Sequence, residues 1–287
     1  MTDTQGSSFP PHGSLCEMYK ALVIGNGESR YWYCPSHQTI MGNVMTWGCN
    51  AIHRDGSVDH LVAVDYAMQQ EIYDSGYCLE SPDRDHWCHF ANWSPLPSSV
   101  ADVMFMGYDI PESLIHRSKN RTDQCVISGK DPDTIQEKIE MALQLNPDLD
   151  MKDLVQKMEK DVGVWITYIN ESDMVSSIDF PVGWSAGNTA LHLAAQQKDY
   201  DEIYILGFDL SSYDDSLNNI YKGTDNYLPA TSKGFSSINW MNQMKTVFQE
   251  FSDKQFYWVD RQFEEKLYFD NVKDLTKADL CDKLHII

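Results

Sequence analysis

The chain has 287 residues and a formal net charge of −21, with 22 lysines and arginines against 43 aspartates and glutamates. Hydrophobic residues make up 42% of it and aromatic residues 12%, which is enough for a sizeable core and excludes a disordered chain. The acidic balance argues against broad electrostatic binding of a nucleic-acid backbone, while a local pocket for one nucleotide stays compatible with it.

The seven cysteines are widely spaced, odd in number and without a CxxC pair, which is typical of a reducing compartment. The first residues lack the basic and apolar regions of a signal peptide, and no apolar run approaches the ~20 residues of a membrane span. We therefore expect a soluble, cytoplasmic protein without a membrane partner, and a homo-oligomer is compatible with the sequence. The spacing of Cys78, His86, Cys88 and His89 fits no structural zinc template, so neither a metal nor a cofactor is predicted.

Short apolar runs that stop at glycine or at a polar residue predict buried parallel strands. Helical spacing between some of these runs, with Ser236-Ser237 as N-cap of the last helix, predicts intervening helices. The alternation indicates an α/β protein with a Rossmann-like, largely parallel sheet flanked by helices, and with a lid or insertion region. The predicted strands are 20–24, 43–47, 60–64, 103–106, 125–128, 164–169, 202–206 and 255–259, and the predicted helices include 135–143, 151–158 and 238–251.

The sequence predicts one main domain over residues 18–260. A stretch over 1–17, rich in serine, proline and glycine, is expected to be a loose lead-in. Polar, aperiodic sequence places an insertion at about 75–160, and the segment 261–287 is expected at the periphery.

The first candidate site is the turn Gly25-Asn26-Gly27-Glu28-Ser29-Arg30, directly after the first strand. Glycines at a strand end allow a tight turn whose amides can face an anion, and Ser29 and Arg30 can add a hydrogen bond and a charge. The pattern has neither the third glycine of a dinucleotide fingerprint nor the Gly-Lys-Ser/Thr of a P-loop. It favours nucleotide binding through Gly25, Asn26, Gly27 and Ser29, against a tight turn without a ligand.

Two polar residues follow the next predicted strands. Asn50 ends the second and can pair with a base edge or a sugar hydroxyl, or can cap the following turn. Asp65 ends the third and can hold a ribose hydroxyl, or can cap the helix that follows it. A second acid beside Asp65 is missing, so a metal-dependent transferase site is not favoured and metal is expected to be dispensable.

A small-residue turn at Ser185, Gly187 and Asn188 opens an alanine-rich helix whose free amides suit a phosphate or a carboxylate. The alternative is a serine-capped core helix, in which His192 is a core residue. Further on, a buried strand ends in Gly-Phe-Asp209, and a loop with several tyrosines follows. Tyr221 and Lys222 of that loop can stabilise a phosphate leaving group, against the alternative of an aromatic latch.

The order of these motifs resembles the bacterial sialyltransferases with a Rossmann-like, CMP-sugar-binding fold. Those enzymes have a Gly-Asn-Gly-x-Ser turn, a Cys-Asn after the second strand and a Ser-Gly turn before a helix that leads to Ile-Tyr-Leu-x-Gly-x-Asp. This chain has the corresponding segments 25–29, 49–50, 185–188 and 203–209, the last of which reads Ile-Tyr-Ile-Leu-Gly-Phe-Asp. Motility accessory factors and the pterin pyrophosphokinase-like family share much of the pattern, and uncharacterised proteins of marine tailed phages are similar around 25–30, 65–77 and 221–227. The resemblance covers roughly residues 20–66 and 183–245.

The resemblance implies that Asn26, Gly27 and Asn50 contact the nucleotide, that the turn from Ser185 faces the donor sugar or its phosphate, and that tyrosines after Asp209 stabilise the departing phosphate. The sialyltransferases carry a histidine base after this loop, whereas this chain has no histidine between His192 and His285. Proton abstraction would then fall to a carboxylate, and the candidates are Asp209, Asp214 and Asp225.

The sequence thus predicts a metal-independent glycosyltransferase that takes a CMP- or UDP-sugar as donor and a hydroxyl as acceptor. Its expected catalytic residues are Asp209, Tyr221 and Lys222. A phage origin would place it in the host cytoplasm and would make a glycan or a hydroxymethylated DNA base the acceptor. The alternatives are a nucleotide-dependent pyrophosphokinase-like enzyme and a nucleotide-binding module without catalysis.

Overall fold

The computed structural model describes residues 19–79 except 38–39 and 41–42, residues 86–97 except 92, residues 124–128, 165–167 and 174–178, residues 180–261 except 182, 211–215 and 235, and residues 268–286. The predicted strand 103–106 and the predicted helices 135–143 and 151–158 lie outside these residues, as do the lead-in 1–17 and Asp214.

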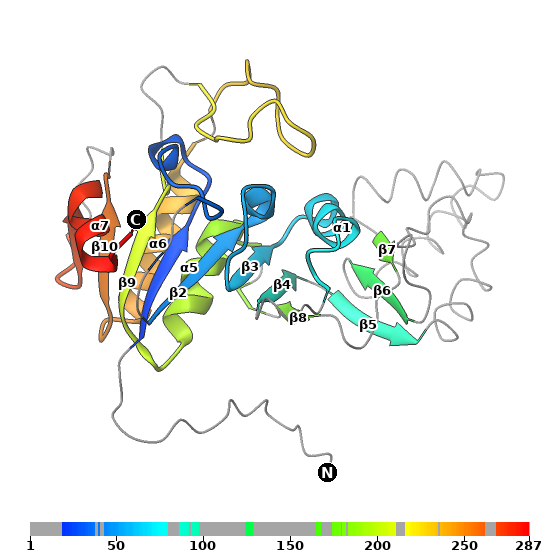
Figure 1. Cartoon of the computed structure of the whole chain (residues 1–287), viewed down its shortest axis with the longest axis horizontal. Helices are drawn as coiled ribbons and strands as arrows, with labels where there is room; N and C mark the ends of the chain where they lie inside the picture. Colours follow the sequence, from blue (N-terminus) through cyan, green and yellow to red (C-terminus); the bar gives the residue numbers. More distant parts are fainter. Residues whose placement is uncertain are drawn as a thin grey trace, which may run out of the picture.

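The main sheet has eight strands, and all of its pairs are parallel (Figure 1). The spatial order is β11-β10-β9-β1-β2-β3-β4-β8. The strands are β1 (Tyr19–Ile24), β2 (Val44–Cys49), β3 (His60–Ala63), β4 (Trp87–Ala91), β8 (Val175–Ile178), β9 (Tyr200–Leu206), β10 (Gln255–Val259) and β11 (Val272–Leu275). The run β3-β2-β1-β9-β10-β11 has the 3-2-1-4-5-6 order of a Rossmann-like fold, which confirms the predicted α/β class.

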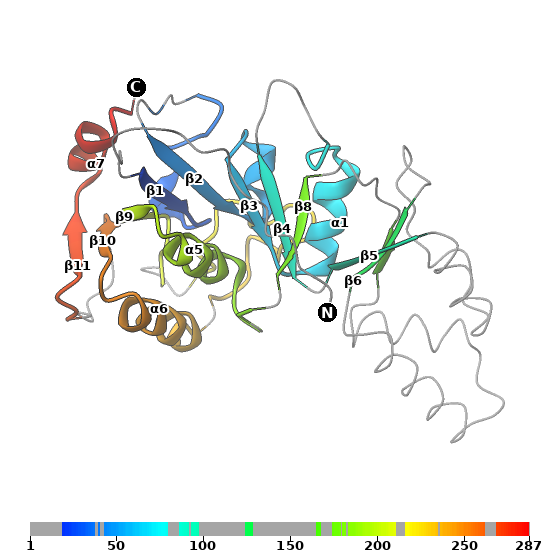
Figure 2. The ribbon, with the colours of Figure 1, turned by 90° about the horizontal axis from the view of Figure 1, so that it is seen from below.

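Helices cover both faces of this sheet (Figure 2). They are α1 (Tyr66–Asp74), α5 (Ala186–Gln196), α6 (Ile238–Glu250) and α7 (Lys277–Leu284), and two short 3₁₀ helices, η1 (Glu28–Arg30) and η2 (Asn50–Arg54), follow β1 and β2. Side chains of β1 alternate between the two cores: Ala21 and Val23 pack on the side of α5 and α6, and Leu22 and Ile24 on the side of α1 and α7. Burial on both faces explains why β1 is apolar at every central position.

Several strands were not predicted from the sequence. They are β4, β8, β11 and β5 (Trp93–Pro97). Strand β5 pairs antiparallel with β6 (Gln124–Ser128), and β6 with β7 (Trp165–Thr167), in a separate sheet of three strands. Within the range predicted as an insertion, β4 belongs to the main sheet, and the segment after residue 260 adds β11 to its edge and α7 to one face.

None of the helices in the described part of the chain is long and apolar enough to cross a membrane.

Candidate functional site

A cleft opens at the carboxyl end of the sheet, where the strand order reverses between β1 and β9. It has a volume of about 140 Å³ and is open to solvent. Open α/β sheets bind their ligands at such a switch point. The lining consists of Gly25, Asn26, Gly27, Cys49, Asn50, Ser185, Ala186, Gly187, Asn188, Gly207, Phe208, Asp209, Leu210, Asn218, Asn219 and Trp240.

Most of the residues predicted for the site lie in this lining. They are Gly25, Asn26, Gly27, Asn50, Ser185, Gly187, Asn188 and Asp209. They come from the turns after β1, β2 and β9 and from the start of α5, so the fold brings together four segments that are far apart in the sequence. The remaining predicted residues, Ser29, Asp65, Tyr221 and Lys222, lie outside the lining.

The turn after β1 is glycine-rich because it runs against the turn after β9. The amide of Gly25 donates to the carbonyl of Leu206 and that of Gly27 to the carbonyl of Gly207, both at 2.8 Å. A Cβ atom on Gly25 would lie 2.4 Å from the carbonyl oxygen of Gly207. The close approach of two backbones therefore requires glycine at position 25.

The anion held by this turn is the carboxylate of Asp209. Its Oδ2 accepts the amide of Ser29 at 2.7 Å, and the neighbouring amide of Glu28 donates to Oδ1 of Asn218 at 2.8 Å. These amides, which the sequence associates with a phosphate, thus have acceptors within the protein. Burial raises the pKa of Asp209, while the hydrogen bonds from Ser29 lower it.

The start of α5 supplies a second group of amides. Ser185 is the N-cap, and its Oγ accepts the amide of Asn188 at 3.4 Å. In an α-helix the amides of Ala186 and Gly187 have no intrahelical acceptor, and both residues line the cleft. Their partial positive charge makes this end of the cleft the suitable place for a phosphate or a carboxylate.

The side chain of Asn188 connects α5 to α6. Its Nδ2 donates to the carbonyl oxygen of Trp240 at 3.0 Å and to Oε1 of Gln243 at 2.9 Å. The same Gln243 oxygen accepts the amide of Ser185 at 3.2 Å. These bonds fix the first turn of α5 at the cleft wall.

Asn50 begins η2 with a left-handed backbone, at φ 52°, directly after β2. This conformation is one that asparagine tolerates better than most residues. The preceding residue, Cys49, has a carbonyl oxygen that accepts Nδ2 of Asn26 at 3.3 Å, which joins the turns after β1 and β2. Burial raises the pKa of the Cys49 thiol to about 12, so this cysteine stays protonated and is no nucleophile at neutral pH.

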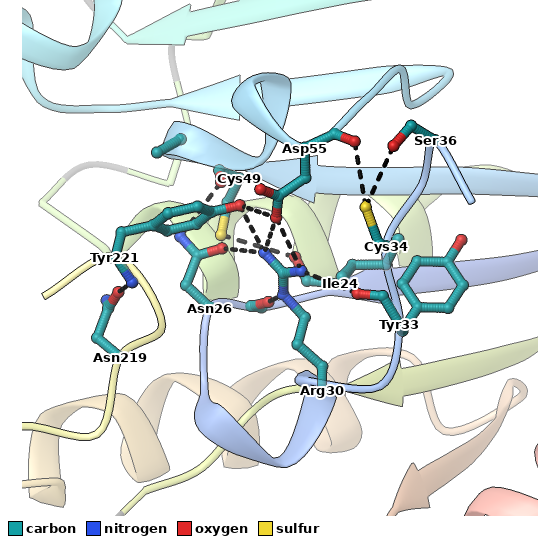
Figure 3. A network of polar contacts seen from close by, with 12 residues as sticks. Ile24, Asn26, Arg30, Tyr33, Cys34, Ser36, Cys49, Asp55, Asn219 and Tyr221 are labelled. Atoms are coloured by element: carbon teal, nitrogen blue, oxygen red, sulfur yellow. Dashed lines mark hydrogen bonds and ion pairs between the residues drawn. The ribbon is translucent and has the colours of Figure 1, made fainter. Parts of the chain in front are cut away.

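Arg30 lies fully buried behind the turn and ties three segments together (Figure 3). Its Nε donates to the carbonyl oxygen of Gly25 at 2.6 Å, and its guanidinium pairs with Asp55 at 3.3 Å. One guanidinium nitrogen also donates to the hydroxyl of Tyr221 at 2.8 Å and to Oδ1 of Asn26 at 3.3 Å. The charge of Arg30 is therefore used inside the protein and is not presented to a ligand.

Residues 216–234, which we call the strap, lie over the carboxyl ends of β1 and β2 (yellow in Figure 1). A bridge between Ser216 and Lys233 closes the strap at its base. The hydroxyl of Tyr227 accepts Nδ2 of Asn26 at 3.3 Å and the amide of Ala51 at 3.4 Å. Arg54 donates to Oγ1 of Thr224 at 2.7 Å. These contacts hold the strap against the turns after β1 and β2.

Tyr221 and Lys222 are engaged with protein groups in this arrangement. The hydroxyl of Tyr221 donates to Oδ2 of Asp55 at 2.5 Å, and the ammonium of Lys222 pairs with Glu28 at 2.6 Å. A role for either residue at a leaving phosphate stays a prediction.

Two other predicted residues have structural positions. Asp65 is the N-cap residue of α1, and its backbone carbonyl accepts the amide of Gln69 at 2.9 Å. His192 is fully buried on α5, with its ring in edge contact with Phe180, Trp184 and Phe251, which is the core position that the sequence offers as an alternative.

Three residues that the sequence does not single out support the site. Asn218 lines the cleft, Asp55 pairs with Arg30 behind the turn, and Gln243 accepts hydrogen bonds from the start of α5. Asp55 lies 25 residues after Arg30, and Asn218 lies 190 residues after Glu28. The only local signal is that Asp55 follows the predicted second strand, where the residues of a switch-point site are found.

No family model, curated protein or solved structure matches this chain. Within the described residues, no group of three or more histidine, cysteine, aspartate or glutamate side chains is placed to hold a metal ion.

Proposed function

We propose that the protein is a glycosyltransferase that binds a nucleotide-activated sugar in the switch-point cleft and transfers the sugar to a hydroxyl. The observation that carries this proposal is the position of Asp209. Among the described residues that line the cleft it is the only carboxylate, and it shares the cleft with the first amides of α5. A base and an anion-binding helix start in one cleft are what a transfer with a phosphate leaving group requires.

In the proposed reaction, Asp209 accepts the proton of the acceptor hydroxyl. The acceptor oxygen then forms a bond to the anomeric carbon of the sugar, and the bond from that carbon to the phosphate oxygen breaks. The nucleotide leaves with the bonding electrons, and the amides of Ala186 and Gly187 stabilise the charge that grows on its phosphate. A pKa raised by burial makes Asp209 a stronger base than an exposed aspartate.

The resemblance to the sialyltransferase-like motifs supports a CMP- or UDP-sugar as donor. The net charge of −21 favours a glycan over DNA as acceptor, because DNA would meet like charge.

A thermal-shift screen with CMP, UDP, GDP and ATP tests the binding step, and we expect one of the pyrimidine nucleotides to stabilise the protein. Release of that nucleotide from its sugar conjugate, with and without a glycan acceptor, then measures turnover. Asp209→Asn should lower turnover by about 10²-fold or more and leave nucleotide affinity within a few-fold.

Asp225→Asn is the matched control, because Asp225 is an exposed aspartate on the strap and is itself a candidate base from the sequence. Full turnover by Asp209→Asn would contradict the role of Asp209. Nucleotide binding without turnover by the native protein would identify a binding module, and turnover that depends on ATP and magnesium would identify the pyrophosphokinase-like alternative.

A further inference from the structure

Three residues beside Asp209 form a polar group that spans the turn after β1 and the strap, and we call it the strap cluster: Glu28, Asn218 and Lys222. The amide of Glu28 donates to Oδ1 of Asn218 at 2.8 Å. The carboxylate of Glu28 pairs with the ammonium of Lys222 at 2.6 Å. Both ends of Glu28 are thus held by the strap.

The contacts of Asn218 fix the orientation of its amide. Its Oδ1 accepts a backbone N–H, which can only donate, so the opposite end of the amide is the NH₂ group. The side chain of Asn218 also hydrogen-bonds Asp209. The NH₂ group therefore donates to the carboxylate, which favours its ionised form and restricts its rotation.

The pair of Glu28 and Lys222 acts on Asp209 through charge. The negative charge of Glu28 raises the pKa of Asp209, because it disfavours a second carboxylate nearby. The ammonium of Lys222 offsets that charge at 2.6 Å, and the side chains of Lys222 and Glu28 are only 22% and 29% exposed. Behind the turn, Arg30 and Asp55 are paired with each other.

We propose that Asn218 and Lys222 are positioning residues, through which the strap sets the orientation and the ionisation of Asp209. The proposal rests on the function proposed above, because it makes Asp209 the group that the cluster serves. The strap then contributes to catalysis through Asp209, and Lys222 itself does not contact the substrate. Loss of the Asn218 donor, or of the Lys222 charge, should raise the pKa of Asp209, so that a higher pH is needed to ionise it.

The test is a titration of the Asp209 carboxyl by ¹³C NMR on the full chain, with the signal assigned by its loss in Asp209→Asn. The apparent pKa should rise by about 1 in Asn218→Leu and by about 0.5 in Lys222→Met. Lys233→Met is the matched control, since Lys233 is an exposed lysine on the same strap, and its titration should equal that of the native protein. The acid limb of the turnover profile should move in the same direction.

An unchanged Asp209 pKa in Lys222→Met and Asn218→Leu would overturn the proposal, and Lys222→Met alone decides if Asn218→Leu does not fold. The NMR titration needs no turnover, so it separates the two proposals. If the variants raise the pKa of Asp209 but the native protein transfers no sugar, the positioning role of the strap cluster stands and the glycosyltransferase function is wrong. If the native protein transfers sugar but the variants leave the pKa of Asp209 unchanged, the glycosyltransferase function stands and the positioning role is wrong.

Discussion

The turn after β1 and the strap meet beside Asp209, but different interactions hold them in place. The turn is fixed by backbone contacts with the end of β9, close enough that Gly25 leaves no room for a Cβ atom. The strap is held largely by side chains, with Tyr227 on Asn26 and Arg54 on Thr224 as examples. Where two backbones are in close contact, few residue types fit at the contact position. A segment held by side chains depends instead on several separate bonds, which substitutions can remove one at a time.

Removal of Arg30 should have the largest effect, because this residue contacts both regions. Arg30→Met leaves Asp55 without its buried cation and the carbonyl of Gly25 without its donor. We expect a loss of about 4 kcal/mol in the free energy of unfolding, measured by urea denaturation. Faster hydrogen exchange should appear in the turn and the strap together. Exchange that rises in one of them alone would show that Arg30 does not couple the two regions.

The turn by itself should be sensitive to a single methyl group. Gly25→Ala places a Cβ 2.4 Å from the Gly207 carbonyl oxygen, and we expect a loss of about 3 kcal/mol. Gly183→Ala is the control: this glycine has a φ of +73° but no atom within 4 Å of its missing Cβ. It should cost only about 1 kcal/mol, through backbone strain alone. Equal losses in the two variants would mean that the close approach at Gly25 relaxes.

Removal of a single hydroxyl group from the strap should have the smallest effect on stability. Tyr221→Phe keeps the buried ring and removes the hydroxyl that bonds Arg30 and Asp55, so we expect a loss of about 1 kcal/mol. Tyr221→Ala also removes the ring and should lose about 3 kcal/mol more. If a nucleotide sugar is turned over, Tyr221→Phe also tests the leaving-group prediction. A hundredfold drop in turnover with unchanged stability would place its hydroxyl at the phosphate and would contradict the structural role.

The elements predicted well are those with continuous burial. Strands β1 and β9 are buried on both faces at the centre of the sheet, so their apolar runs stand out in the sequence. The missed strands lie elsewhere: β11 is an edge strand with lysine and aspartate at its centre, and β5 contains two prolines. Edge strands and short strands do not need an apolar residue at each position, so periodicity does not find them.

The sequence by itself determined the α/β class and the strand-end motifs, because buried parallel strands and glycine turns leave local patterns. Gly25, Asn50 and Asp209 follow such strands and are therefore predictable from the sequence. Only the tertiary structure decided which partner each charged side chain and each turn amide binds. Arg30 pairs with Asp55 and Lys222 with Glu28, and the turn amides hold the Asp209 carboxylate. Such pairs join residues that the chain separates by as many as 194 positions, and the choice between a protein partner and a ligand is made by burial and distance, which spacing along the sequence does not encode.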